Sequence, residues 1–300
     1  MAAVTLLDTP PPPDRVVARI GLIADTHMPD RLPDLPDAIG VAFRDVDLIL
    51  HAGDVGELRA LDALSEIAPV VAVHGNDDTV ESQRELPYQQ LVSAGGLRLL
   101  LTHAHYPDRA DELAARQDDS WPPKLARRAE MARRADAQII VFGHTHVPMT
   151  VPWGEALLVN PGAVAPGSHF ARQLIASVAR LTVRADGAVC VEHIDLAKPH
   201  ATFAPQVDLA AGFLAGIEQV QASIIAADMK PLVQGVANLF RPGGLGREDA
   251  DTVRDVLRRL AYRCWTGERD LITRAEMESA LRHDLPADLW RRTMTIIGIS

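Results

Sequence analysis

The residues best suited to chemistry are histidines, aspartates and one asparagine that directly follow short apolar segments. The five apolar segments span residues 20–24, 48–50, 70–73, 97–101 and 139–142. The polar residues after them include Asp25, His27, Asp54, Asn76, Asp77, His103, His105, His144 and His146. Carboxylate oxygens and imidazole nitrogens suit divalent first-row metals, and a shared carboxylate can hold two ions ~3.5–4 Å apart. The pattern therefore indicates a site for two metal ions.

The elements that must position these residues form an alternating pattern. Strands are predicted at 16–24, 46–50, 70–73, 97–101 and 139–142, and helices at 57–67 and 108–135. Such alternation favours α/β layers. The carboxyl ends of parallel strands face a common crevice, so residues far apart in sequence are expected to meet there. Glycines 53, 75 and 143 let the backbone turn sharply beneath such a site.

The chain divides into three predicted parts. Residues 1–14 end in four prolines and form a disordered tail, and residues 15–200 form the main domain. Strands at 156–159, 173–184 and 188–196 predict a second, more antiparallel sheet after residue 150. Residues 201–300 form a helical extension with helices at 209–227, 231–240, 248–263 and 273–283. We expect this extension to pack against the main domain. The alternatives are that it forms a lid over the crevice or a contact between the subunits of a dimer.

Composition excludes several classes of protein. The 300 residues carry a formal net charge of −10, which argues against general binding to nucleic acid or to an anionic membrane. Cys190 and Cys264 lie far apart and predict neither a disulfide framework nor a zinc knuckle. The sequence lacks a secretory signal and an apolar run of the ~18 residues that a membrane-spanning helix needs. We therefore expect a cytoplasmic protein, and a homo-oligomer is left open.

The ordered series of motifs resembles that of the calcineurin-like metallophosphoesterases. Its members are Asp25-x-His27, Gly53-Asp54, Gly75-Asn76, His103 and Gly143-His144-x-His146. Asn160-Pro161-Gly162 resembles a further element of the small prokaryotic phosphodiesterase branch. The resemblance covers about residues 16–197 and implies a four-layer α/β/β/α sandwich, to which the helical extension is added.

The resemblance also implies a role for each candidate ligand. The first metal ion would be bound by Asp25, His27 and His146, and the second by Asn76, His103 and His144. Asp54 would bridge the two ions. The cofactors would be two divalent ions of Mn, Fe, Zn, Ni or Co. A hydroxide between the ions would attack the phosphorus, since coordination lowers the pKa of water and the cations stabilise the developing charge.

Two positions next to the ligands bear on substrate and proton transfer. Asp77 stands where relatives commonly have His or Cys, and an ionised carboxylate there would repel a phosphate dianion. That charge favours singly charged diesters. His105 is a candidate for contacting phosphate or acting as the general acid, and a structural role for it is equally open. Asn76 and His105 are thus the predicted substrate-binding residues, and His105 and Asp77 the predicted catalytic ones.

Three functional hypotheses follow. The first is a metal-dependent phosphodiesterase that acts on a small phosphate ester by attack of the metal-bridging hydroxide. The second is a phosphomonoesterase or a dinucleoside-polyphosphate hydrolase with His105 as the acid. The third is a non-catalytic binding scaffold of the same fold, which the sequence disfavours because all seven ligand positions carry competent side chains.

Overall fold

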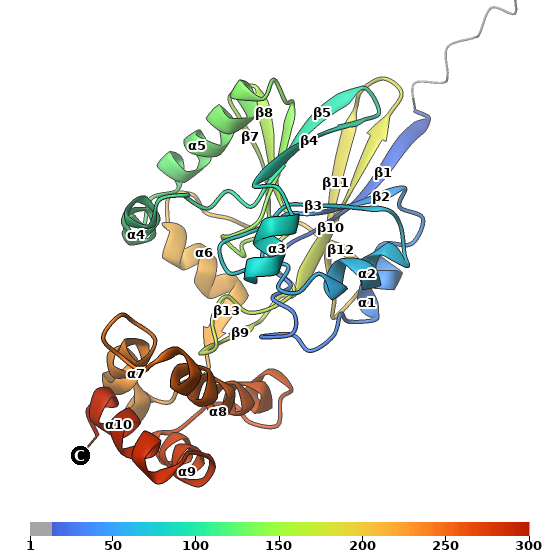
Figure 1. Ribbon diagram of the computed structural model, residues 1–300. Helices are drawn as coiled ribbons and strands as arrows, with labels where there is room; N and C mark the ends of the chain where they lie inside the picture. The colour runs from blue at the N-terminus through green and yellow to red at the C-terminus, as the bar shows by residue number, and fades with distance from the viewer. Residues whose placement is uncertain (1–13, 300) are drawn as a thin grey trace, which may run out of the picture.

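The strands of the protein form two large sheets that face each other, with helices on the outer sides (Figure 1). This arrangement comes from a computed structural model that describes residues 14–299. The predicted disordered tail, residues 1–14, lies outside the described residues except for Asp14.

The first sheet has six strands, of which β1, β2 and β3 run parallel. Its order is β12 (Thr202–Phe203), β11 (Val189–Asp195), β10 (Ser177–Arg184), β1 (Val16–Ile23), β2 (Leu48–His51) and β3 (Val70–Ala72). Ile23 pairs with His51, so the strands β1 and β2 end side by side. The residues that follow the two strands therefore emerge at the same edge.

The second sheet has five strands, with a parallel centre and antiparallel edges. Its order is β4 (Gln89–Ala94), β5 (Leu97–Thr102), β6 (Ile139–Phe142), β8 (Ala156–Asn160) and β7 (Met149–Trp153). Thr102 pairs with Phe142, so β5 and β6 also end together. The five strands that precede the candidate ligands thus belong to two sheets rather than to one.

The prediction of a separate antiparallel sheet after residue 150 is wrong. Strand β8 joins β6 in the second sheet, whereas β10 and β11 extend the first sheet next to β1. Apolar patterning shows which face of a strand is buried, but it does not show which strand is the neighbour. Each sheet is therefore completed by strands from the second half of the main domain.

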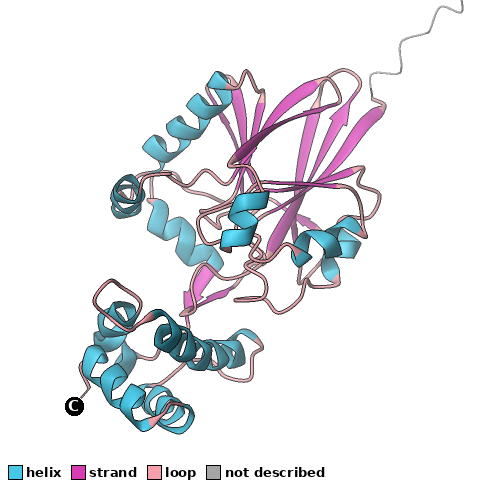
Figure 2. Cartoon of the chain, in the orientation of Figure 1, coloured by secondary structure: helices cyan, strands magenta, loops and turns pink. Residues whose placement is uncertain are grey.

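The sandwich has the predicted four layers (Figure 2). Apolar residues of both sheets, among them Leu22, Leu101 and Leu181, form the core between them. Helices α1 (Ala38–Ala42) and α2 (Arg59–Ser65) cover the first sheet. Helices α5 (Trp121–Arg134) and α6 (Phe213–Val220) cover the second. A further short helix, α3 (Val80–Glu85), follows β3, and neither α1 nor α3 was predicted.

The helix predicted over 108–135 is two helices. Helix α4 (Arg109–Gln117) begins at Asp108, whose side chain accepts hydrogen bonds from Ala110 N and Asp111 N. Helix α5 begins at Trp121 and has prolines in its first turn, where the missing N–H leaves no bond unmade. The two prolines cannot continue α4, so the chain breaks at residues 118–120.

The C-terminal segment departs from the prediction at its start and at its end. The helix predicted over 209–227 ends at Val220, because residues 221–223 form strand β13 (Gln221–Ser223), which pairs with β9 (Ala171–Gln173). Helix α10 (Ala287–Ile297) was not predicted. The remaining elements are η1 (Ala227–Leu232), α7 (Val233–Leu239), α8 (Arg247–Trp265) and α9 (Arg274–Asp284).

Elements η1 and α7–α10 pack around a core of their own, which includes Val253, Met277 and Leu281 (Figure 1). Helix α6 instead packs against the second sheet with α5. The division predicted at residue 200 stays a prediction, but packing associates α6 with the sandwich. No helix within residues 14–299 has the length and apolar character needed to cross a membrane.

Candidate metal centre

The candidate ligands lie in loops at the carboxyl ends of strands from both sheets. Asp25 and His27 follow β1, Asp54 follows β2, and His103 follows β5. Asn76 follows β3, and His144 and His146 follow β6. Five of the seven candidates have positive φ: Asp25 (55°), His27 (44°), Asp54 (52°), His144 (71°) and His146 (59°). Only a few per cent of non-glycine residues adopt such angles, and they concentrate at functional sites.

Asp54 lies between two groups of possible ligands. His103 Nε2 is 3.2 Å from Asp54 Oδ2, and His27 Nε2 is 3.7 Å from the same oxygen. On the other side of the cluster, His146 Nε2 is 3.3 Å from Asp25 Oδ1. The possible metal-ligating atoms of Asp25, His27 and His146 lie within 4.8 Å of one another, and so do those of Asp25, Asp54 and His103. All five side chains are buried.

Several buried polar atoms of these residues have no hydrogen-bond partner, and they suit a metal ion. His103 Nδ1 bonds to Ala52 O at 2.8 Å, and its Nε2, on the side of Asp54, has no hydrogen bond. Asn76 Oδ1 is also buried without a partner. An unpartnered buried polar atom costs roughly 1–3 kcal/mol, which coordination would remove. Histidine nitrogen, carboxylate oxygen and amide oxygen are all competent ligands, so the residues fit a metal site.

The electrostatics of the cluster favour ionised carboxylates. Burial would raise the pKa of Asp54, but the adjacent His103 imidazolium holds that pKa well below its usual range. Burial would likewise lower the pKa of His103, but the Asp54 carboxylate outweighs it and raises this pKa to about 10. Burial lowers the pKa of His27 to about 3, so this imidazole stays neutral. Two buried carboxylates thus require positive charge beside them.

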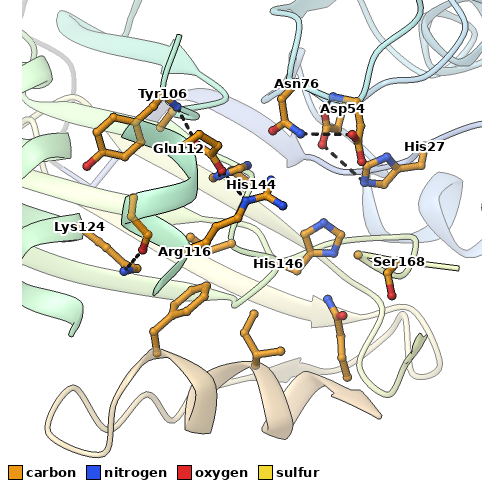
Figure 3. A pocket seen from close by; sticks show the side chains of 18 of the residues that line it. His27, Asp54, Asn76, Tyr106, Glu112, Arg116, Lys124, His144, His146 and Ser168 are labelled. Carbon is orange, nitrogen blue, oxygen red and sulfur yellow. Dashed lines mark hydrogen bonds and ion pairs between the residues drawn. The ribbon is translucent and has the colours of Figure 1, made fainter. Parts of the chain in front are cut away.

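His144 is held by a residue that sequence reasoning missed. Its Nε2 lies 2.9 Å from Glu112 Oε1, and Glu112 also accepts from Tyr106 N at 2.9 Å and from Arg116 Nε at 2.7 Å. The His144 ring lies 5.1 Å from that of His103, centroid to centroid, and outside the tight groups around Asp54. Figure 3 shows Glu112 and His144 together on the side of the cavity away from His27.

Arg31 is a second residue outside the motifs. Its NH2 lies 2.6 Å from Asp77 Oδ2, and its NH1 lies 3.2 Å from His27 Nε2 and 3.3 Å from Pro166 O. Burial would raise the pKa of Asp77, but the Arg31 guanidinium holds it below its ordinary value. Asp77 therefore lies beside the ligands as an ionised, already paired carboxylate.

The structure does not bring His105 to the cavity. Its ring packs against Tyr88 (5.0 Å between centroids), His103 (5.5 Å) and His74 (5.9 Å). Burial lowers the pKa of His105 to about 3. The His105 ring also lies 6.3 Å from that of His144, centroid to centroid, so a part for His105 in substrate binding or proton transfer stays a prediction.

Two polar residues support the ligand loops without being ligands. His51 Nε2 lies 3.0 Å from Thr26 Oγ1, as expected for a residue that orients the loop of Asp25. Asn160 Nδ2 donates to Gly143 O at 3.0 Å and to Thr145 Oγ1 at 2.9 Å. The Asn-Pro-Gly motif therefore fixes the loop that carries His144 and His146.

A cavity of about 270 Å³ opens beside the ligands. His27, Asp54, Asn76, His144 and His146 line one side of it (Figure 3). The other side is formed by Tyr106, by α4 and α5, by α6 and by Gln221 of β13. This arrangement leaves room for a small molecule next to the metal ligands.

Residues 19–186 match the calcineurin-like phosphoesterase superfamily domain, and the chain belongs to this family. This confirms the membership predicted from the ordered motifs. A probable metallophosphoesterase of Methanothermobacter thermautotrophicus is 35% identical over 144 residues, which are 48% of this chain and 76% of that protein. The phosphodiesterase YfcE of Escherichia coli (strain K12) is 31% identical over 113 residues, which are 35% of this chain and 50% of YfcE.

Among solved structures, vacuolar protein sorting 29 from Cryptosporidium parvum aligns with a TM-score of 0.45 and 20% sequence identity. The alignment covers 63% of this chain and 100% of that one. The family match ends at residue 186, so α6, β13 and the C-terminal helices lie beyond it.

Proposed function

We propose that this chain is a metal-dependent phosphodiesterase that binds two metal ions at the ends of β1, β2, β3, β5 and β6. The observation that carries the proposal is the shared position of Asp54, whose carboxylate is within 4 Å of both His27 and His103. A carboxylate between two sets of ligands is what a dinuclear hydrolytic site requires.

In this proposal each ion has its own ligands. Asp25, His27 and His146 hold the first ion, and Asn76, His103 and His144 hold the second, with Asp54 shared. The ions would be Mn, Fe, Zn, Ni or Co. When bound, they supply a water of lowered pKa as the nucleophile and stabilise the negative charge that develops on phosphorus-bound oxygens.

Hydrogen bonds within the protein hold the histidine ligands in the tautomer that can bind a metal ion. His103 Nδ1 donates to Ala52 O, which leaves Nε2 with a lone pair for the metal. His144 Nε2 donates to Glu112, which leaves Nδ1 with the lone pair. The proposal leaves the general acid unassigned, because His105 lies beside His103 and His144 but does not itself line the cavity.

The charges of the cavity favour a diester monoanion over a monoester dianion. Asp77 brings a negative charge to the cavity and pairs with Arg31. A second guanidinium, that of Arg116, is paired with Glu112. The Asp77 carboxylate repels a phosphate dianion more strongly than a diester with one negative charge. The relative YfcE is named a phosphodiesterase, which agrees with this preference.

Replacing the shared carboxylate tests the proposal. In Asp54→Asn we expect bound metal to fall at both positions and hydrolysis of bis(4-nitrophenyl) phosphate to fall by about a hundredfold or more, because one charge serves two ions. Metal analysis of the purified protein, together with diester and monoester assays, measures both effects. Asp136→Asn is the matched control, since Asp136 is an exposed carboxylate paired with Arg98 away from the site.

Two outcomes would count against the proposal. Normal turnover together with two bound metal ions in Asp54→Asn would show that Asp54 does not bridge the ions. A wild-type protein that retains no metal and hydrolyses neither ester would support the scaffold hypothesis instead.

A further inference from the structure

Part of the wall of the cavity that faces the metal ligands is formed by residues beyond the family match. Phe213 and Ile217 of α6 and Gln221 of β13 line the cavity together with His144 and His146. Figure 3 shows α6, the pale orange helix, below His146. The family domain ends at residue 186, so this wall is a feature of this chain rather than of the matched domain.

Helix α6 is fixed at its N-terminal end by α5 and the residues before it. Trp121 Nε1 donates to Gly212 O at 3.0 Å, and Phe213 N donates to Asp119 O at 2.6 Å. Leu214 N donates to Asp119 Oδ1 at 2.7 Å. These bonds satisfy N–H groups that a helix leaves without partners in its first turn.

The C-terminal end of α6 is fixed by strand pairing. Leu174 N donates to Val220 O at 2.7 Å, and Gln221 pairs with Gln173 in the register of β13 and β9. A β-carbon added to Gly167 would lie 3.1 Å from Gln221 Nε2 and 3.5 Å from His146 Cε1. Gln221 and His146 are therefore close neighbours, and α6 forms a fixed wall rather than a lid that must close.

The wall is apolar, and the basic side chains around the cavity are already bonded. Phe213 and Ile217 are half-buried and face the cavity. Lys124 Nζ donates to Ala115 O at 2.8 Å, and Arg128 NH1 donates to Lys124 O at 2.8 Å. Arg31 and Arg116 are paired with carboxylates, as described above. The part of the cavity away from the metal ligands thus offers the apolar surface of Phe213 and Ile217, and the Lys124 ammonium lies 5.1 Å from the centre of the Phe213 ring.

We propose that α6 binds the apolar, ring-sized ester group of a small phosphodiester whose phosphate lies at the metal centre. This inference rests on the proposed function and specifies its substrate class. The cavity, about 270 Å³, is near the lower end of the ~300–1,000 Å³ of small-molecule sites. It suits one phosphate and one ring better than a polymer or a dinucleoside polyphosphate. Apolar surface removed from water on Phe213 and Ile217 supplies the preference.

The experiment compares diphenyl phosphate with dimethyl phosphate, because the two carry the same charge and differ in their ester groups. Binding of each to the metal-loaded protein is measured by calorimetry, and the same samples are analysed for released phenol and methanol so that heat of hydrolysis is separated from heat of binding. We expect the wild type to bind diphenyl phosphate at least about tenfold more tightly. The double variant Phe213→Ala/Ile217→Ala should lose most of this preference while its affinity for dimethyl phosphate changes less than about threefold.

Two further variants serve as controls. Leu214→Ala lies on the same helix, but Leu214 is 59% exposed and does not line the cavity, so both affinities should be unchanged. Ile217→Ala alone leaves the contact between Phe213 and Trp121 in place and should shift the preference in the same direction as the double variant. This single variant separates loss of the wall from loss of folding.

The possible failures are distinguishable. A wild type that prefers neither ester, or a preference that survives in both Ile217→Ala and the double variant, would overturn the role of α6 and leave the diesterase proposal standing. A metal-loaded wild type that binds neither diester would instead contradict the proposed function.

Discussion

At the scale of single residues, Glu112 orients His144. A carboxylate that accepts the N–H of a metal-binding histidine fixes the ring and raises its basicity, and its loss typically costs 10–100-fold in metal affinity. We therefore expect Glu112→Gln to lower the affinity for the second metal ion by about tenfold, because the amide lacks the negative charge. Metal titration of the apo-protein by calorimetry measures this. In Arg116→Gln the affinity for the second metal ion should stay within about threefold of the wild-type value, since Arg116 is half-exposed and contacts Glu112 rather than His144. Equal metal affinity in Glu112→Gln and wild type would show that His144 needs no such support.

Asp77 is expected to set the balance between substrate charges. Asp77→Asn removes the nearer carboxylate beside the Arg31 guanidinium at the edge of the cavity and leaves Asp30, whose Oδ2 is 3.7 Å from Arg31 Nε. A phosphate dianion should then bind better, and we expect the ratio of monoester to diester hydrolysis to rise by about tenfold, with kcat/KM for 4-nitrophenyl phosphate measuring the gain. Asp77→His should shift the ratio in the same direction. An unchanged ratio in both variants would refute the charge argument.

The positions of the candidate ligands were predictable because each follows an apolar strand, and the carboxyl ends of these strands lie together in the two sheets. Arg31 and Glu112 were not, because neither lies in a motif. Arg31 reaches Asp77 across 46 positions, and Glu112 reaches His144 from the helix after β5. Such contacts depend on how helices pack against the sheets, which the spacing of residues does not specify.

At the scale of elements, the loop after β3 depends on Gly75 having no side chain. A β-carbon there would clash with Asp54 Oδ1 and lie 2.5 Å from Asp54 N. We expect Gly75→Ala to displace the shared carboxylate and to lower bound metal and diester hydrolysis by at least about tenfold. Gly40→Ala is the matched control, because a β-carbon at Gly40 on α1 meets nothing within 4 Å. This control should be stabilised by roughly 0.5–1 kcal/mol in thermal unfolding. Full metal content in Gly75→Ala would contradict the claim that the close packing of Gly75 against Asp54 holds the shared carboxylate in place.

The elements themselves were predicted unevenly, and the reasons are physical. The buried parallel strands β1, β2, β5 and β6 are continuous apolar runs, which the sequence identifies directly. The edge strand β4, with its largely exposed residues 89–91, carries no such signal and was missed. The partition of strands between two sheets was also missed, because β10 pairs with β1 across more than 150 positions.

At the scale of the whole molecule, the two hydrophobic cores predict two units that differ in their dependence on metal. Residues from Ile224 to Ile297 form one core, and the space between the sheets holds another. The units meet near the site, where Trp265 Nε1 donates to Ala171 O at 2.7 Å and Arg258 NH1 lies 3.8 Å from Asp30 Oδ1. Metal ions bind the sandwich alone in our proposal, so added metal should stabilise the sandwich more than the C-terminal helices.

Leu281→Ala tests this division. Leu281 is fully buried in the C-terminal core, and its truncation should cost ~2–5 kcal/mol. We expect hydrogen exchange to speed up in α8–α10 while β1, β2, β5 and β6 stay protected and two metal ions stay bound. Leu101→Ala, its counterpart between the sheets, should instead lower both protection of the strands and metal content, because Leu101 belongs to the core beneath His103. If Leu281→Ala lost metal to the same degree as Leu101→Ala, the cores would be one cooperative unit, and the C-terminal helices would be part of the framework that holds the metal ligands in place.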